Sequence, residues 1–134
     1  MEQVSEATAL RDLMPLAAKL GIEIDTATPE HVVGRLAWAP DLCTTGNVLH
    51  GGALMALADT LGGVCAYLNL PTGAGTATIS SSTNMMRAVR QGEVTGETRP
   101  LHVGRSVIVV QTSLVDSEQR LVAQVTQSQA VLSG

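Results

Sequence analysis

A run of twenty residues from Gly51 to Leu70 is apolar over almost its whole length and sets the main choice for the fold. The run is about as long as a transmembrane helix. However, Asp59 lies at its middle, where a charge costs about 3 kcal/mol on membrane insertion. It also contains Asn69 and four glycines, and no Lys or Arg flanks it as an anchor. We therefore predict a buried core helix over 51–70 in a protein that is not inserted in a membrane.

Asp59 is the only charged residue between Asp41 and Arg87. A helix that is apolar on every side is typical of one that is buried on every side. A buried carboxylate without a cation nearby is unfavourable, because burial disfavours its charged form. The side chain either has a structural role, capping another helix or pairing with an arginine of the sheet, or it serves the function of the protein. The residues alone leave both interpretations open.

The rest of the chain predicts one short helix and several strands. Residues 5–20 are predicted as an amphipathic helix that ends at Gly21 and that Pro15 kinks or splits. Residues 22–39 are predicted as a strand or hairpin with a turn near Pro29. Short turns separate the later strand-like segments, which favours antiparallel pairing; they span 76–89, 92–103, 105–116 and 119–132. This order predicts a single α+β domain over residues 1–134, with the helix against one antiparallel sheet.

Composition excludes several classes of function. Aromatic residues make up 1% of the chain and the net charge is −4, so the stacking platforms and basic surface of a nucleic-acid-binding protein are missing. Charged residues make up 15% against 45% hydrophobic, which predicts a homo-oligomer that buries surface between its subunits. Cys43 and Cys65 are widely spaced and predict buried thiols rather than a zinc site. The first residues lack the pattern of a secretory signal, so we expect a cytoplasmic protein.

The residues that begin the apolar helix suggest a second chemical group. His50 is followed by Gly51 and Gly52, and the first backbone N–H groups of a helix are unpaired and lie at its positive end. Such donors stabilise a carbonyl oxygen that gains negative charge, and glycine allows a ligand to approach the backbone closely. A tight turn into the helix is the other interpretation of this motif.

The spacing of these groups implies a dimer if they act together. Asp59 lies eight residues beyond Gly51, which is about 12 Å along one helix axis. A carboxylate therefore does not reach a carbonyl held at the start of its own helix. Two antiparallel helices from different subunits bring Asp59 of one beside Gly51 of the other. A catalytic role for this pair thus requires a twofold dimer with two equivalent sites.

Two stretches of the chain resemble a known family. The stretch G-N-V-L-H-G-G-A-L-M-A-L-A-D, at 46–59, resembles the signature of hotdog-fold acyl-CoA thioesterases. The stretch S-T-N-M-M-R-A-V-R-Q-G-E-V-T-G-E-T-R-P-L-H-V-G-R-S, at 82–106, is similar to the branch of the phenylacetate-degradation and 1,4-dihydroxy-2-naphthoyl-CoA thioesterases. The resemblance implies a long central helix wrapped by a curved antiparallel sheet of five to six strands, plus a short N-terminal helix. It also implies dimers that join sheet edge to sheet edge and pair into tetramers.

The resemblance further implies roles for single residues. Asp59 is expected to be the nucleophile or the general base that activates water. The Gly51 N–H of the other chain is expected to polarise the thioester carbonyl, and His50 to assist binding or orientation. Neither a metal nor a cofactor is expected beyond the coenzyme A of the acyl-CoA substrate. The expected substrate-binding residues are Thr44, Asn47, Gly52, Thr78, His102, Gly104, Arg105 and Ser106.

Some of these substrate-binding assignments have particular reasons. Relatives usually carry Asn or Gln six residues before the histidine, where this chain has Thr44, and Asn47 is a substitute nearer in sequence. The segment around Arg105 matches the part that lies near the CoA nucleotide and phosphates in relatives, and a guanidinium suits a phosphate by charge and by its fork of donors. Arg87 and Arg90 are further basic candidates.

Three functions fit this pattern to different degrees. Hydrolysis of an acyl-CoA or acyl-carrier thioester is favoured. A hotdog dehydratase is disfavoured, because such enzymes usually use a catalytic histidine in another arrangement. A non-catalytic acyl-CoA binding module gains support from the loss of the Asn or Gln at Thr44, but a pure binder gains nothing from keeping Asp59 in an apolar helix.

Overall fold

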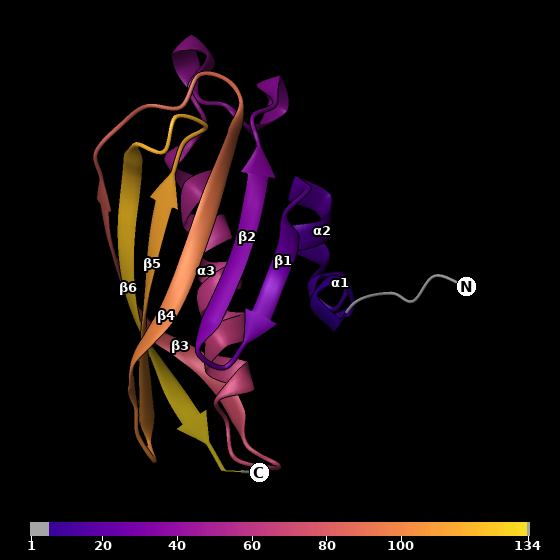
Figure 1. The fold of residues 1–134 in the computed structure, drawn as a ribbon, viewed down its shortest axis with the longest axis vertical. Coiled ribbons are helices and arrows are strands. Elements are labelled where there is room, and N and C mark those ends of the chain that lie inside the picture. The colour runs from indigo at the N-terminus through magenta and orange to yellow at the C-terminus, as the bar shows by residue number, and fades with distance from the viewer. Residues whose placement is uncertain (1–5, 134) are drawn as a thin grey trace.

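The computed structural model describes residues 6–133, and these form three helices and six strands, joined by two short 3₁₀ turns. Figure 1 shows their arrangement. The helices are α1 (Glu6–Asp12), α2 (Pro15–Leu20) and α3 (Gly51–Leu68), and the 3₁₀ turns are η1 (Pro40–Leu42) and η2 (Thr45–Asn47). The strands are β1 (Glu23–Thr28), β2 (His31–Ala37), β3 (Gly75–Met85), β4 (Glu93–Val103), β5 (Val107–Val115) and β6 (Leu121–Leu132).

The predicted elements are present with altered ends. The segment predicted as one N-terminal helix forms two, because Pro15 begins α2 and cannot continue α1; residue 5, where that helix was predicted to start, lies outside the described residues. The hairpin of β1 and β2 turns at residues 29–30, as predicted. β3 ends at Met85 rather than near residue 89, because the Met86 and Arg87 N–H groups both donate to the Val122 carbonyl and end the regular ladder.

The six strands form one antiparallel sheet in the order β1-β2-β4-β5-β6-β3, and α3 lies against one of its faces (Figure 1). Residues of β5 alternate between buried and half-buried along its whole length. The buried ones face the core and are those predicted to share one face: Ile108, Val110, Thr112 and Leu114. The predicted α+β fold, a long helix against an antiparallel sheet, is therefore confirmed.

Two glycines on neighbouring strands make room for a helix side chain. Gly34 of β2 pairs with Gly96 of β4, and a Cβ on either would lie 2.6 Å from a methyl group of Leu61. Leu61 is fully buried in the depression that these glycines leave. A residue with a side chain at either position forces the helix away from the sheet or Leu61 out of its rotamer.

The prediction that α3 is buried on every side is wrong for the single chain. The sheet covers one side of the helix, and Gly52, Met55, Asp59 and Tyr67 form an exposed stripe on the other. α3 is long and apolar enough to cross a membrane, yet half of it is buried inside the protein. It is the core helix of this fold, as predicted.

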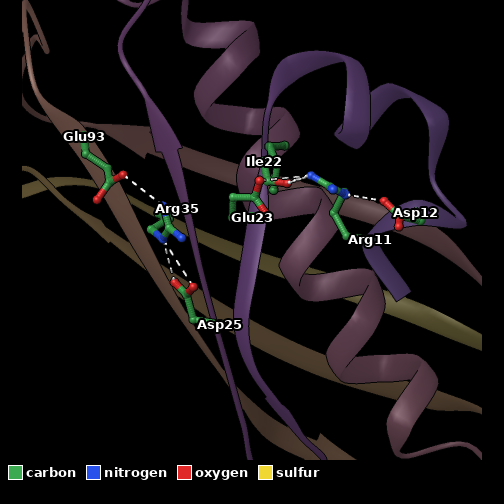
Figure 2. A network of polar contacts seen from close by, with 7 residues as sticks. All are labelled: Arg11, Asp12, Ile22, Glu23, Asp25, Arg35 and Glu93. Carbon is green, nitrogen blue, oxygen red and sulfur yellow. Dashed lines mark hydrogen bonds and ion pairs between the residues drawn. The ribbon is translucent and has the colours of Figure 1, made fainter. Parts of the chain in front are cut away.

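Polar contacts connect α1 with the start of β1, and ion pairs connect β2 with β1 and β4. Figure 2 shows Arg11 of α1 donating to the Ile22 carbonyl at 2.9 Å, while Arg35 of β2 lies between Asp25 of β1 and Glu93 of β4. These contacts fasten α1 and β1 at the end of the sheet opposite β3. β3 is the other end, and along the residues that the structure describes its outer edge pairs with no strand.

Candidate active site

The start of α3 has one capped and one free backbone donor. His50 precedes the helix in an extended conformation, and its Nδ1 accepts a hydrogen bond from the Gly52 N–H at 2.8 Å. This cap is a structural role for His50, and it leaves Nε2 to carry the proton of a neutral ring. The Gly51 N–H has no hydrogen-bond partner within residues 6–133. It is therefore a free donor at the positive end of the helix.

A cavity of about 380 Å³ opens beside this donor. Thr44 and Gly51 line it, together with Met85, Met86 and Arg87. A Cβ at Gly51 would lie 2.9 Å from the Met85 Cε, so the end of β3 lies directly against the start of α3. We call this hollow the Gly51 cavity. It combines an apolar wall with a free N–H and a cation, which suits a substrate with an acyl chain and a polar carbonyl.

Other residues predicted to assist catalysis or bind substrate near Gly51 do not line this cavity. His50 and Gly52 open onto a separate hollow of about 320 Å³ beside Leu42 and Cys43. The Asn47 carbonyl accepts from the Trp38 indole at 3.0 Å, and Asn47 is not among the lining residues. Of the two alternatives for the missing Asn or Gln of relatives, only Thr44 therefore faces the cavity.

Asp59 lies two turns further along α3 and has one hydrogen-bond partner among the described residues. Its Oδ1 accepts from Gln127 Nε2 at 2.7 Å. Gln127 lies on the inner face of β6 and is 1% exposed, whereas Asp59 itself is exposed in the single chain. Neither structural role considered for Asp59 is present, because it caps no described helix and pairs with no arginine within residues 6–133.

The residues predicted to contact CoA lie at the other end of the sheet. His102 is near the end of β4, and Gly104, Arg105 and Ser106 form the turn into β5. The Ser106 carbonyl accepts from the Val131 N–H at 2.9 Å, next to the start of β3. A Cβ at Gly104 would lie 2.9 Å from the Val107 carbonyl oxygen, which is backbone and cannot easily move, so glycine suits this position. Arg105 forms no ion pair with any residue that the structure describes, so its guanidinium is available to an anion.

Thr78 lies on the helix side of β3, at the same end of the sheet as the β4–β5 turn. Its hydroxyl donates to Gln129 Oε1 at 3.1 Å, and Gln129 is 1% exposed. Thr78 lies seven residues before Met85 along β3, about 23 Å from the end that borders the Gly51 cavity. Within one chain the predicted site residues therefore form two groups, one at each end of the sheet, with Asp59 between them.

Cysteine and metal chemistry have little support in this region. Cys65 of α3 is fully buried, and burial raises the pKa of its thiol to about 11, so it stays protonated and unreactive near neutral pH. Cys43 is only half-buried, so the prediction of a buried thiol is wrong for it, and both cysteines are free thiols. No cluster of three metal-ligating side chains occurs within residues 6–133. Asp59 and the Gly51 N–H are the groups best suited to act on a carbonyl.

Comparison with known proteins decides the family. A family model described as the Thioesterase superfamily matches residues 46–123, which is more than half of the chain and includes both Gly51 and Asp59. The chain belongs to this superfamily. The resemblance predicted from the sequence is thereby confirmed.

Individual relatives support the same assignment. Over 75 residues the chain is 35% identical to the 1,4-dihydroxy-2-naphthoyl-CoA hydrolase of Escherichia coli K12; the match covers 56% of this chain and about half, 55%, of that hydrolase. A thioesterase structure from Haemophilus influenzae has a TM-score of 0.90 at 26% identity, covering 98% of this chain and 93% of that one. A thioesterase structure with coenzyme A from Streptococcus pneumoniae has a TM-score of 0.77 at 25% identity, covering 84% and 86%. The hotdog fold predicted from the sequence is thus confirmed.

Sequence reasoning missed Gln127. It lies among polar residues of a strand whose two faces are hard to distinguish by composition, since Gln124, Gln127 and Gln129 alternate irregularly. One signal was available: Gln127 and Gln129 are two and four residues after Val125, so they share a face with an apolar residue.

Proposed function

We propose that the protein hydrolyses acyl-CoA thioesters at a site shared between two copies of the chain. Asp59 of one copy acts on a carbonyl that the Gly51 N–H of the other copy polarises. The observation that carries this proposal is the free Gly51 N–H beside a cavity, with the exposed Asp59 on the same helix too far away to act there alone. The separation is about 12 Å for eight helical residues.

The reaction needs no metal or redox group. As a general base, Asp59 takes a proton from water, and the resulting hydroxide attacks the carbonyl carbon. The negative charge that develops on the carbonyl oxygen is stabilised by the Gly51 N–H. The C–S bond then breaks, the sulfur accepts the proton, and a free acid and a thiol leave. As a nucleophile, Asp59 attacks the carbonyl carbon and the C–S bond breaks, so that a mixed anhydride forms and the thiolate leaves. Water then hydrolyses the anhydride to the free acid and restores Asp59, and the proton released goes to the thiolate.

The free edge of β3 supports a twofold partner. A long unpaired edge strand offers a row of backbone donors and acceptors to a second strand. β3 runs for eleven residues, from Gly75 to Met85, and Ile79 on it is 59% exposed. A second copy that pairs its β3 antiparallel to this one extends the sheet across both chains and satisfies the backbone groups of the paired residues.

The positions of the two catalytic groups suggest the register of this pairing. Gly51 lies against Met85, while Gln127, which holds Asp59, pairs with Ser81. Thr83 lies midway between Ser81 and Met85 on β3. A twofold axis near Thr83 therefore exchanges these two positions and brings Asp59 of one copy beside Gly51 of the other.

The same axis supports a phosphate role for the β4–β5 turn. The turn lies beside the start of β3, and with the axis near Thr83 the start of one β3 extends past the end of the other, toward the residues that follow Met85. Arg105 of one copy then approaches the Gly51 cavity of its neighbour, on the side of Arg87. Two cations near one cavity mouth suit the phosphates of CoA.

A dimer of dimers in the cytoplasm completes this proposal. On the helix side, Leu13 is 76% exposed, Tyr67 is 56% exposed, and Leu16 and Met55 are exposed as well. Apolar side chains gathered on one side are typical of a further subunit contact. The scarcity of charge across the chain favours the same arrangement.

Replacement of the proposed base tests this function. Asp59→Asn keeps the size of the side chain and removes its charge, so we expect hydrolysis of acyl-CoA substrates to fall by about 100-fold or more. Because Asp59 is exposed in the single chain, the melting temperature should stay close to that of the wild type. Asp25→Asn is the matched control, an exposed acid on the far side of the sheet, and should keep full activity. An Asp59→Asn protein that hydrolyses at the wild-type rate would contradict the proposal.

A screen over aryl, short-chain and long-chain acyl-CoA compounds identifies the acyl group. The same screen with acyl-carrier-protein thioesters distinguishes the two kinds of carrier. A protein that binds these compounds and hydrolyses none of them would instead be a binding module, and one that releases water from a hydroxyacyl group would be a dehydratase.

A further inference from the structure

We propose that Gln127 is a positioning residue that holds the Asp59 carboxylate in the orientation needed for hydrolysis. Its Nε2 donates a hydrogen bond of 2.7 Å to Asp59 Oδ1. This inference rests on the proposed function, because it gives Gln127 a role only through Asp59. A hydrogen bond to a charged carboxylate is short and directional, so it restricts an otherwise mobile side chain.

The burial of Gln127 is hard to explain by stability. The side chain is 1% exposed on the inner face of β6, one inward position after the buried Val125. Its Oε1 is buried and accepts no hydrogen bond from the residues that the structure describes. A buried amide with one unpaired end costs free energy that an aliphatic side chain of the same size would avoid. The chain nevertheless has an amide here, and its one bond is to Asp59.

The helix is shaped around this amide. Gly62 lies three residues after Asp59 on α3, on the same side of the helix. A Cβ at Gly62 would collide with Gln127 Oε1, and the next nearest atoms would be Gln127 Cδ at 3.0 Å and a methyl group of Val110. Glycine at this position therefore lets the Gln127 side chain pass between sheet and helix to reach the carboxylate.

The contact leaves the reactive part of Asp59 available. Only Oδ1 has a hydrogen bond within the described chain, so Oδ2 is free to meet water or a thioester carbon. Asp59 is otherwise exposed and would sample several rotamers. Fixing one oxygen selects the rotamer in which the other faces the substrate, and misplacement by about 1 Å can cost roughly 100-fold in rate.

Gln127→Met tests this role, because methionine has a similar length and no donor. We expect kcat to fall by about 10- to 100-fold while KM changes by less than about twofold. The melting temperature should be equal to or higher than that of the wild type, since an unpaired buried amide oxygen is removed. Thr112→Val is the matched control: it removes a buried hydrogen bond of 2.6 Å to Thr98 on the same inner face, away from Asp59, and should leave kcat unchanged.

A double-mutant cycle separates this inference from the proposed function. If Gln127 acts through Asp59, Gln127→Met has no further effect on kcat in an Asp59→Asn background. A Gln127→Met protein with the wild-type kcat, or one whose loss is just as large without Asp59, would overturn the positioning role. In both cases inactivity of Asp59→Asn alone would leave the proposed function standing. Gly62→Ala, which displaces the amide while keeping both partners, should lower kcat in the same way.

Discussion

Asp59 and the Gly51 N–H lie at opposite ends of one stretch of α3. Among the residues that the structure describes, Asp59 has a hydrogen bond only from Gln127 and the Gly51 N–H has none, and neither group reaches the other within a single copy. This is the pattern expected of groups that meet across a twofold axis. Arg105 follows the same pattern. It forms no ion pair with the described residues and lies at the end of the sheet far from the Gly51 cavity.

Arg105→Ala should weaken binding of CoA thioesters and leave the chemistry intact. We expect KM for an acyl-CoA to rise by about 10-fold, because a charge-assisted contact to a phosphate is lost, while kcat changes little. A short thioester without the nucleotide should be hydrolysed equally well by the variant and the wild type.

Steady-state kinetics on both kinds of substrate checks this result. Arg99→Ala, which removes an exposed cation from β4 near Glu97, is the control for a general change in charge. Equal losses on both substrates would show that Arg105 does not act on the nucleotide.

For single residues, the sequence was most informative where a residue differs in polarity from its neighbours. Asp59 could be identified because it is a charged residue in an apolar helix. Gly51 could be identified because it follows His50 at the start of that helix. Gln127 is not conspicuous, because its role depends on which face of β6 meets α3, and that depends on the register of the whole sheet. The exposure of Asp59 was also not predictable, since it depends on how much of α3 the sheet covers.

Among the elements, the contact between α3 and the sheet depends on two missing side chains. Leu61 fits where Gly34 and Gly96 face each other on β2 and β4. This fit holds α3 at a fixed height above the strands, so it also fixes the distance from Asp59 to β6. Packing here and the proposed chemistry are therefore linked through the same helix.

Gly96→Ala should destabilise the protein by about 1–3 kcal/mol in the free energy of unfolding. The added Cβ would lie 2.6 Å from Leu61 Cδ1 and 2.9 Å from Leu114 Cδ2, both fully buried, and overpacking a core typically costs this much. Gly63→Ala is the matched control, because nothing lies within 4 Å of its Cβ. Alanine there should raise the free energy of unfolding by about 0.5–1 kcal/mol through its helix propensity. Urea unfolding of both variants checks the pair, and a neutral Gly96→Ala would contradict this packing of Leu61 against the two glycines.

The elements themselves were largely predictable from periodicity. Alternation identifies β5, and Pro15 marks the break between α1 and α2. The end of β3 was not predictable, because it is set by a local contact in which two successive N–H groups share the Val122 carbonyl. The strand order was not derivable from the turns either, since β3 joins the sheet beside β6, the last strand, rather than beside β4.

For the whole molecule, the unusual composition and the free surfaces agree. A chain with few charges presents an unpaired edge on β3 and an exposed stripe on α3, and both are explained if further copies cover them. In the proposed dimer, one copy supplies Asp59 and the other supplies the Gly51 N–H. Two inactive variants that each lack one of these groups should then complement each other.

Gly51→Pro is suited to this test, because proline lacks the N–H and is favoured at the first position of a helix. His50 before it already has an extended backbone, with φ −61° and ψ 135°, which is compatible with a following proline. The added Cβ would lie 2.9 Å from Met85 Cε, so the flexible end of the Met85 side chain has to move aside. We expect Gly51→Pro alone to fold with this local adjustment and to be nearly inactive, like Asp59→Asn alone.

The decisive measurement is the thioesterase activity of these two variants when they are coexpressed in equal amounts. Random pairing makes half of the dimers mixed, and each mixed dimer has one intact site of two, so activity should recover to about a quarter of the wild-type value. Different affinity tags on the two chains confirm that mixed dimers form. If mixed dimers form and activity stays at the level of the separate variants, the site lies within one chain and the account is wrong.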